Sequence, residues 1–149
     1  MRTSALAALG AFLFTIGCCL SAAQGKPGKK EPVSVYAELE GAPEKFRAKA
    51  NPLANDKDAV AAGRVLFDEH CAECHGRNAL GTKKAPSLRA GEVQAAPPGT
   101  LFWILTNGIV RKGMPVWSKL PEPERWQLAS FIKSLGPVES TENRTAGRP

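Results

Sequence analysis

The sequence has few of the residues that would indicate a disulfide-stabilised or a nucleic-acid-binding protein. It contains four cysteines, two histidines and two methionines, which leaves few candidates for a metal or redox site. Basic residues exceed acidic ones only modestly, with 20 Lys and Arg against 14 Asp and Glu, and no long run of like charge occurs. A nucleic-acid-binding surface needs denser Lys and Arg on one face. The composition therefore argues against a nucleic-acid partner.

The first 23 residues have the features of a secretory signal peptide. Arg2 precedes the apolar run Ala5–Ile16, and the small residues Ser21-Ala22-Ala23 follow. A positive end, a short apolar core and a small-residue cleavage site are typical of exported proteins. We expect cleavage after Ala23, which predicts a periplasmic protein.

Two alternatives remain open for this segment. No charge occurs between Arg2 and Lys26, so the stretch could span a bilayer as an uncleaved anchor. Gly17-Cys18 also resembles the end of a bacterial lipobox. All three interpretations export the rest of the chain, and membrane association is expected only through residues 3–25.

Composition divides the remaining chain into a linker, one domain and a tail. Residues 24–55 hold several prolines among alternating charges and few large apolar groups, which predicts a linker. A short helix could form around residues 43–50, and the sequence does not decide whether Tyr36 and Phe46 pack on the domain. Residues 56–136 are the expected domain, and residues 137–149 the expected flexible tail.

Three helices are expected in the domain. Asn55 or Asp56 can cap the first, and residues 101–106 fit a second with Thr100 as its N-cap. The third is expected to run from about residue 122 to 135 along one apolar stripe. No alternating apolar run predicts a strand, so the fold class is all-α.

The chemistry is expected at Cys71-Ala72-Glu73-Cys74-His75, which has the C-x-x-C-H pattern of covalent haem attachment. Two thiols at this spacing can add to the two vinyl groups on one edge of a porphyrin, and His75 then projects under the iron. A structural zinc site needs four ligands, and the mature chain offers only His70 besides these. A redox dithiol of the thioredoxin type would need a βαβ pattern. We therefore expect one covalently attached haem c.

Met114 is predicted to be the second iron ligand. It is the only methionine besides the initiator, and it lies well downstream of His75 in Lys112-Gly113-Met114-Pro115. A lone methionine is often core filler, but the flanking Gly and Pro suit a rigid extended loop. His70 lies too close to Cys71 to reach the opposite face of the ring.

With these residues, the chain resembles class I c-type cytochromes, in particular the small mono-haem domains of the cbb3-oxidase subunit III type. The resemblance covers about residues 56–136 and implies the cytochrome c fold, with three main helices wrapped around one covalently bound haem. Gly63 and Phe67 match the first helix of the family, and Phe131 matches the last. The resemblance therefore implies that Phe67 and Phe131 meet edge to face.

The resemblance also implies a role for Pro86. Ala85-Pro86-Ser87-Leu88 looks like the Pro-x-Leu loop of the family, in which the proline carbonyl accepts a hydrogen bond from the second ring nitrogen of His75. Pro86 is on this basis a cofactor-binding residue, and the alternative is a proline in a surface turn. Trp117 is similar to aromatics that shield a haem edge, or it is simply a core residue.

A His/Met site leaves the iron without an open position and favours a comparatively high potential. The sequence therefore predicts a one-electron carrier, not an enzyme, in a periplasmic respiratory or dehydrogenase-linked chain. One alternative is a haem subunit permanently docked to a larger oxidoreductase. A haem peroxidase or gas-binding protein is another, although it would require displacement of Met114.

The expected partners are a redox protein donor and acceptor. Between residues 71 and 120 seven basic residues outnumber the two acidic ones, Glu73 and Glu92, which predicts an acidic docking surface on the partner. The basic residues are Arg77, Lys83, Lys84, Arg89, Arg111, Lys112 and Lys119.

Overall fold

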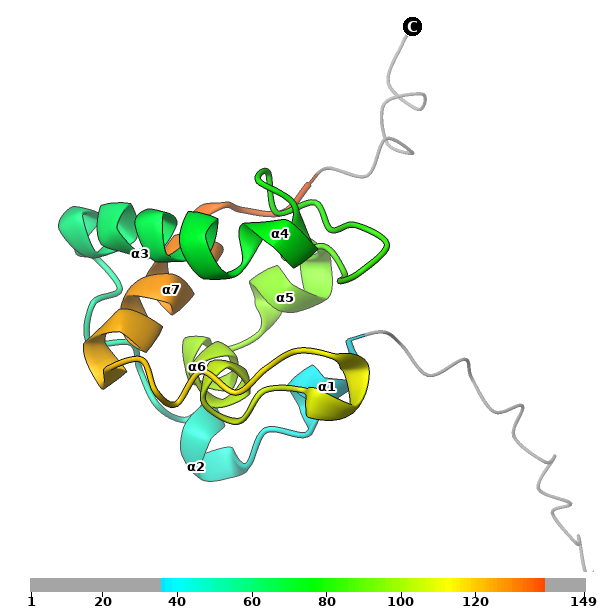
Figure 1. The fold of residues 1–149 in the computed structure, drawn as a ribbon. Helices are drawn as coiled ribbons and strands as arrows, with labels where there is room; N and C mark the ends of the chain where they lie inside the picture. Colours follow the sequence, from blue (N-terminus) through cyan, green and yellow to red (C-terminus); the bar gives the residue numbers. More distant parts are fainter. Residues whose placement is uncertain (1–35, 139–149) are drawn as a thin grey trace, which may run out of the picture. The chain divides into compact units, whose positions relative to one another are not determined.

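The computed structural model describes residues 36–138, which form seven α-helices and one 3-10 helix (Figure 1). In chain order these are α1 (Ala37–Glu40), α2 (Glu44–Arg47), α3 (Lys57–His70), α4 (Ala72–His75), α5 (Gly91–Ala95), α6 (Pro98–Asn107), η1 (Val110–Lys112) and α7 (Glu122–Ser134). No strand occurs among these residues, so the all-α prediction is confirmed. The predicted signal peptide, residues 1–23, and the tail beyond Val138 lie outside the described residues.

Helix α3 begins where the sequence predicts and packs across α7. The Asp56 carboxylate accepts hydrogen bonds from the backbone N–H groups of Asp58 and Ala59, at 2.9 and 3.1 Å. At the crossing a Cβ on Gly63 would lie 2.1 Å from the Gln127 carbonyl oxygen. Only glycine therefore allows the two helices to approach this closely.

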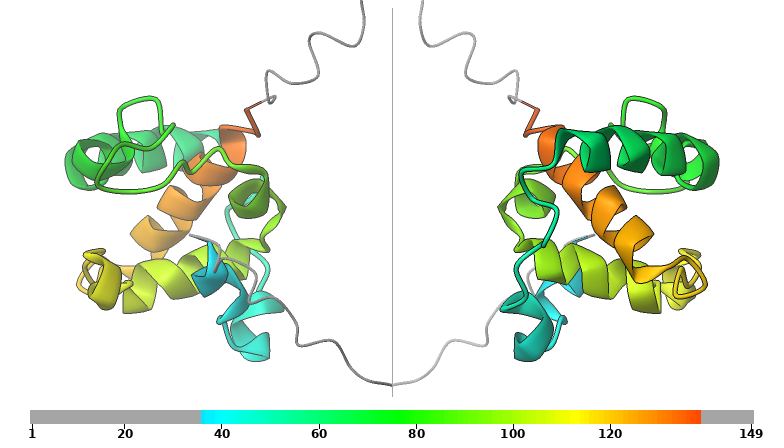
Figure 2. Two further views of the ribbon diagram at one scale, coloured as in Figure 1. Left: turned by 90° about the vertical axis from the view of Figure 1, so that its right-hand side faces the viewer. Right: turned by 90° about the vertical axis from the view of Figure 1, so that its left-hand side faces the viewer.

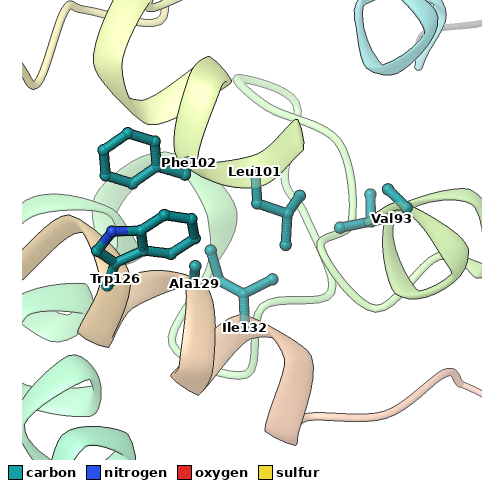
Figure 3. Close-up of a cluster of buried hydrophobic side chains, with 7 residues drawn as sticks. Val93, Leu101, Phe102, Trp126, Ala129 and Ile132 are labelled. Atoms are coloured by element: carbon teal, nitrogen blue, oxygen red, sulfur yellow. The ribbon is translucent and has the colours of Figure 1, made fainter. Parts of the chain in front are cut away.

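Two aromatic contacts fix α7 against its neighbours. Phe67 of α3 and Phe131 of α7 meet as expected, with ring centroids 5.2 Å apart, although the rings are tilted by 49° rather than perpendicular. Phe102 of α6 stacks on Trp126 of α7 at 4.1 Å (Figure 3). These pairs belong to two separate clusters of buried side chains, and α7 contributes to both.

The predicted start of α6 was wrong. The helix runs over Pro98–Asn107 with Pro97 at the N-cap, so Thr100 is not the cap but a fully buried residue inside the first turn. Proline suits the first helical position because its ring fixes φ near the helical value and because the N–H it lacks has no partner there. Pro98 therefore allows the helix to begin upstream of the apolar stripe.

Residues 36–55, predicted as part of a linker, pack on the helices instead. Tyr36 and Phe46 lie against the cluster that contains Phe102 and Trp126. Asn51 is buried, and its side-chain amide donates to the Ser130 hydroxyl at 2.8 Å and to the Trp126 carbonyl at 3.2 Å. The apolar residues of this segment stand singly between charges and prolines, so their burial depends on tertiary contacts that composition does not reveal. The packed unit therefore begins before residue 56.

Figure 2 shows α1 and α2 on the same side of the molecule as α6. A Cβ on Gly99, in the first turn of α6, would lie 1.9 Å from the Phe46 carbonyl oxygen, so α2 crosses α6 in direct backbone contact. Among residues 36–138 no helix combines the length and the apolar character that a membrane span requires.

Candidate haem-binding site

A mostly apolar pocket of about 340 Å³ contains all five predicted site residues. Cys71, Cys74 and His75 line it from the turn into α4, Pro86 from the following loop, and Met114 from the loop after η1. In Figure 1, α4 lies in the upper part of the view, and the yellow segment that contains η1 lies in the lower part. The structure thus brings together residues that are widely separated in the sequence.

The imidazole of His75 is held in one orientation. Its Nδ1 lies 2.9 Å from the Pro86 carbonyl oxygen, the contact that the resemblance implied. Because a carbonyl only accepts hydrogen bonds, Nδ1 carries the proton, and Nε2 of the neutral ring keeps its lone pair. Burial lowers the pKa of His75, although the bond to Pro86 opposes this effect. The neutral ring is the form that binds metals.

The loop between α4 and Pro86 folds back onto the C-x-x-C-H turn. The N–H of Gly81 donates to the His75 carbonyl at 2.8 Å, and the Thr82 hydroxyl donates to the Cys74 carbonyl at 2.6 Å. Gly81 has a φ of +84°, and a Cβ there would lie 2.6 Å from the Ser87 nitrogen. Gly81 and Thr82 therefore position Pro86, a role that the sequence did not suggest.

Cys71 lacks the lowered thiol pKa of a reactive dithiol. No disulfide joins Cys71 to Cys74, and burial raises the pKa of the Cys71 thiol to about 12, with a further contribution from Cys74. Reactive dithiols depend on a lowered thiol pKa. In the part of the chain that the structure describes, no group of three or more His, Cys, Asp and Glu could hold a metal ion. The raised pKa of Cys71 disfavours the reactive dithiol.

Met114 is held by a tight backbone turn. Ile109 and Met114 form an isolated antiparallel bridge, with N–H···O distances of 3.0 and 3.2 Å. Gly113 closes the turn in the left-handed conformation, with a φ of +87°. Gly108 also has a positive φ, and a Cβ there would lie 2.6 Å from the Pro115 oxygen. The backbone of the loop is therefore fixed by the pairing of Ile109 with Met114, which the flanking Gly and Pro alone did not predict.

Two aromatic side chains form part of the pocket wall. Trp117 and His70 both line the pocket, and their rings pack against each other with centroids 5.1 Å apart. Trp117 and Met114 also pack on the buried cluster that contains Phe67 and Phe131. Trp117 therefore belongs both to the core and to the pocket, so the two interpretations of this residue are compatible.

Several of the predicted rim cations have acidic partners. Lys84 pairs with Glu73 at 2.7 Å, while Arg111 and Lys112 both pair with Glu38 of α1 at 2.8 Å. Hydrogen bonds from Lys112 and Arg111 lower the pKa of Glu38 to about 2, against the opposing effect of burial. The sequence count did not include Glu38 because it lies in the segment predicted as a linker. The rim is less basic than predicted.

These residues fit a covalently attached haem, because the pocket is apolar and presents two thiols, an imidazole lone pair and a thioether. Together with the fold they define a class I c-type cytochrome. Residues 58–132 match the family model described as cytochrome C oxidase, cbb3-type, subunit III, and the chain belongs to this family. Its cofactor is one haem c with its iron, covalently bound.

Relatives of several kinds share this domain. Over 100 residues the chain is 37% identical to the cbb3-type cytochrome c oxidase subunit CcoP of Azospirillum brasilense, covering 58% of this chain and 32% of the relative. It is 32% identical over 88 residues to cytochrome c550 of Pseudomonas aeruginosa, and the match covers 56% of this chain and 61% of that protein. It is 33% identical over 86 residues to the quinohemoprotein alcohol dehydrogenase ADH-IIG of Pseudomonas putida, covering 58% and 12%.

The chain thus spans about a third of the length of the CcoP relative. Among solved structures, cytochrome cL of Methylophaga aminisulfidivorans aligns with a TM-score of 0.50 and 24% identity, covering 70% of this chain and 69% of that one. This similarity supports the cytochrome c fold.

Proposed function

We propose that this chain is a one-electron carrier in which His75 and Met114 hold the haem iron. A bound haem c supplies a reversible one-electron couple between ferric and ferrous iron. Cys71 and Cys74 anchor the porphyrin through two thioether bonds. Pro86 fixes the orientation of His75 and raises its basicity through the Nδ1 hydrogen bond.

The observation that carries this proposal is that His75 and Met114 line one pocket from two backbone segments that hydrogen bonds hold in place. With His75 and Met114 both available to a bound haem, the iron would keep the same protein ligands in both oxidation states, so little would rearrange when an electron moves. A peroxidase would need a distal acid–base group. The remaining histidine of the pocket, His70, packs on Trp117.

The test is to measure ligand access and redox behaviour together. The holoprotein should titrate as a single one-electron couple, and its ferrous form should bind carbon monoxide poorly because the Met114 thioether would already be bound to the iron. Rapid carbon monoxide binding by the wild-type protein would move it into the gas-binding or peroxidase class.

A haem domain docked to a larger oxidoreductase is the second candidate function. Two of the relatives above are named as a subunit of a cytochrome c oxidase and as an alcohol dehydrogenase, each much longer than this chain. For this chain we propose a periplasmic respiratory or dehydrogenase-linked role, either as a shuttle or as a docked subunit. Co-purification with a stoichiometric partner distinguishes the two.

An acidic partner surface is proposed from the rim cations that lie near the pocket. The exposed Lys119 lies two residues from Trp117 of the pocket wall. We expect the association rate with the redox partner to fall about tenfold from low to physiological ionic strength. Lys119→Gln should reduce the rate at low salt, whereas Lys57→Gln, at the far end of α3, should not. A rate that is indifferent to salt and to Lys119 would exclude electrostatic steering.

Export is proposed from the residues before Gln24. Protein recovered from an exporting host should begin near Gln24 when its N-terminus is sequenced. Recovery of the intact segment in a membrane fraction would instead support an uncleaved anchor.

A further inference from the structure

Glu38 lies at the edge of the haem pocket, although it is outside the residues that match the family, 58–132. Its side chain is only 10% exposed. Its Oε1 lies 2.8 Å from Nη2 of Arg111, and its Oε2 lies 2.8 Å from Nζ of Lys112. One carboxylate from α1 therefore binds two consecutive residues of η1.

Both of those residues stand close to Met114 in the chain. Arg111 and Lys112 are in η1, and the turn at Gly113 leads directly from η1 to Met114. Met114 packs on the core, but the η1 part of the loop is exposed, with Val110 at 69% and the side chain of Arg111 at 78%. The bridge between Ile109 and Met114 closes this loop on itself, and the two Glu38 contacts attach it to α1.

The other side of the pocket is attached to the same short segment. The Tyr36 hydroxyl donates to the Ser87 carbonyl at 3.2 Å, one residue beyond Pro86. Residues 36–38 therefore contact the loop that orients His75 as well as the loop that carries Met114.

The base of this segment is firmly held. Helix α2 crosses α6 where the Phe46 carbonyl meets Gly99, and no side chain would fit at that position. The buried Asn51 donates hydrogen bonds to two residues of α7. A short, well-anchored segment can transmit a restraint to the loops that it contacts, whereas a loose linker could not.

We propose that Glu38 is a positioning residue that holds the η1 loop (residues 109–114) closed over the haem pocket and so keeps Met114 on the iron. This inference rests on the proposed function, because it takes Met114 to be an iron ligand. The closed loop is favoured by two charge-assisted hydrogen bonds to one largely buried carboxylate. Without them, the loop should open more often and admit small external ligands to the pocket.

The experiment uses the holoprotein with Glu38→Gln, which keeps the shape of the side chain and removes its charge. Glu44→Gln is the matched control, because Glu44 is also an acid of this segment paired with an arginine, Arg47, but it does not line the pocket. Two quantities are measured. One is the rate at which imidazole displaces Met114 from ferric iron, and the other is hydrogen exchange at the backbone N–H groups of Gly113 and Met114.

Glu38→Gln should raise both rates about tenfold, which is the loss expected for removing charge-assisted hydrogen bonds. Glu44→Gln should leave both rates as in the wild type. A loss of global stability would raise the exchange rates of backbone amides throughout α3 and α7. A specific effect of Glu38 should raise the exchange rates of the loop amides alone.

A second variant separates loop position from the direct effect of charge on the iron. Replacing both Arg111 and Lys112 by glutamine should also speed imidazole binding. The reduction potential should move up in Glu38→Gln, which removes a negative charge, and down in the double variant, which removes two positive ones. If Glu38 acts through the loop, both variants should bind imidazole faster, while their reduction potentials should shift in opposite directions.

Wild-type exchange rates at Gly113 and Met114 in Glu38→Gln would overturn the proposal, as would faster exchange without faster imidazole binding. If the wild-type protein lacks an iron–thioether bond, the proposed axial ligand fails instead. Amide exchange then still decides whether Glu38 closes the loop.

Discussion

Met114→Ala should abolish the weak red iron–thioether band of the ferric protein, lower the reduction potential and open the ferrous iron to carbon monoxide. Met114 lines the same pocket as His75, and a thioether ligand favours ferrous iron and so raises the potential. Alanine cannot coordinate, so the sixth position becomes available to water and to external ligands. Visible spectra, potentiometric titration and carbon monoxide mixing measure the three effects.

Val116→Ala provides the matched control, because Val116 belongs to the same loop and is 46% exposed. It should leave the band, the potential and carbon monoxide binding unchanged. The measurements belong near neutral pH, since Lys112 and Lys119 are close enough in sequence to replace Met114 when deprotonated. If Met114→Ala behaves like the wild type, another group is the ligand.

Gly63→Ala should destabilise the protein by about 3 kcal/mol, the upper part of the range for overpacking a tight core. The new Cβ would lie 2.1 Å from the Gln127 carbonyl oxygen and 2.9 Å from the Phe131 Cβ, so α3 and α7 would have to separate. The Phe67–Phe131 contact would weaken with them. The free energy of unfolding, from denaturant titration of the holoprotein, measures this cost.

Gly91→Ala is the control for the general effect of replacing glycine in a helix. Gly91 lies in the first turn of α5, and nothing stands within 4 Å of its added Cβ. Alanine is intrinsically favoured over glycine in helices by about 0.5–1 kcal/mol, so this variant should be neutral or slightly more stable. Equal stability of the two variants would show that the helices do not cross at Gly63.

The features that the sequence predicted correctly are encoded locally. Asp56 caps α3 through its own side chain, and the apolar stripe of α7 repeats every helical turn, so neighbouring residues suffice to predict them. The grouping of Cys71, Cys74 and His75 at one turn is equally local, because it depends only on their spacing.

The features that the sequence did not predict depend on distant contacts. Glu38 meets Arg111 and Lys112 across 73 and 74 residues, and no spacing pattern connects them. Asn51 looks like an ordinary polar residue in a proline-rich stretch, yet it is buried against α7, 75 and 79 residues away. Pro86 required the family resemblance, because nothing in its own neighbourhood indicates that its carbonyl lies beside His75.

The central claim, covalent attachment of haem through Cys71 and Cys74, is tested most directly by acid–acetone extraction of the purified holoprotein. The haem should stay with the wild-type polypeptide because two thioether bonds survive these conditions. It should be extracted from a variant in which both cysteines are replaced by serine. Free release of haem from the wild-type protein would contradict covalent attachment at this site.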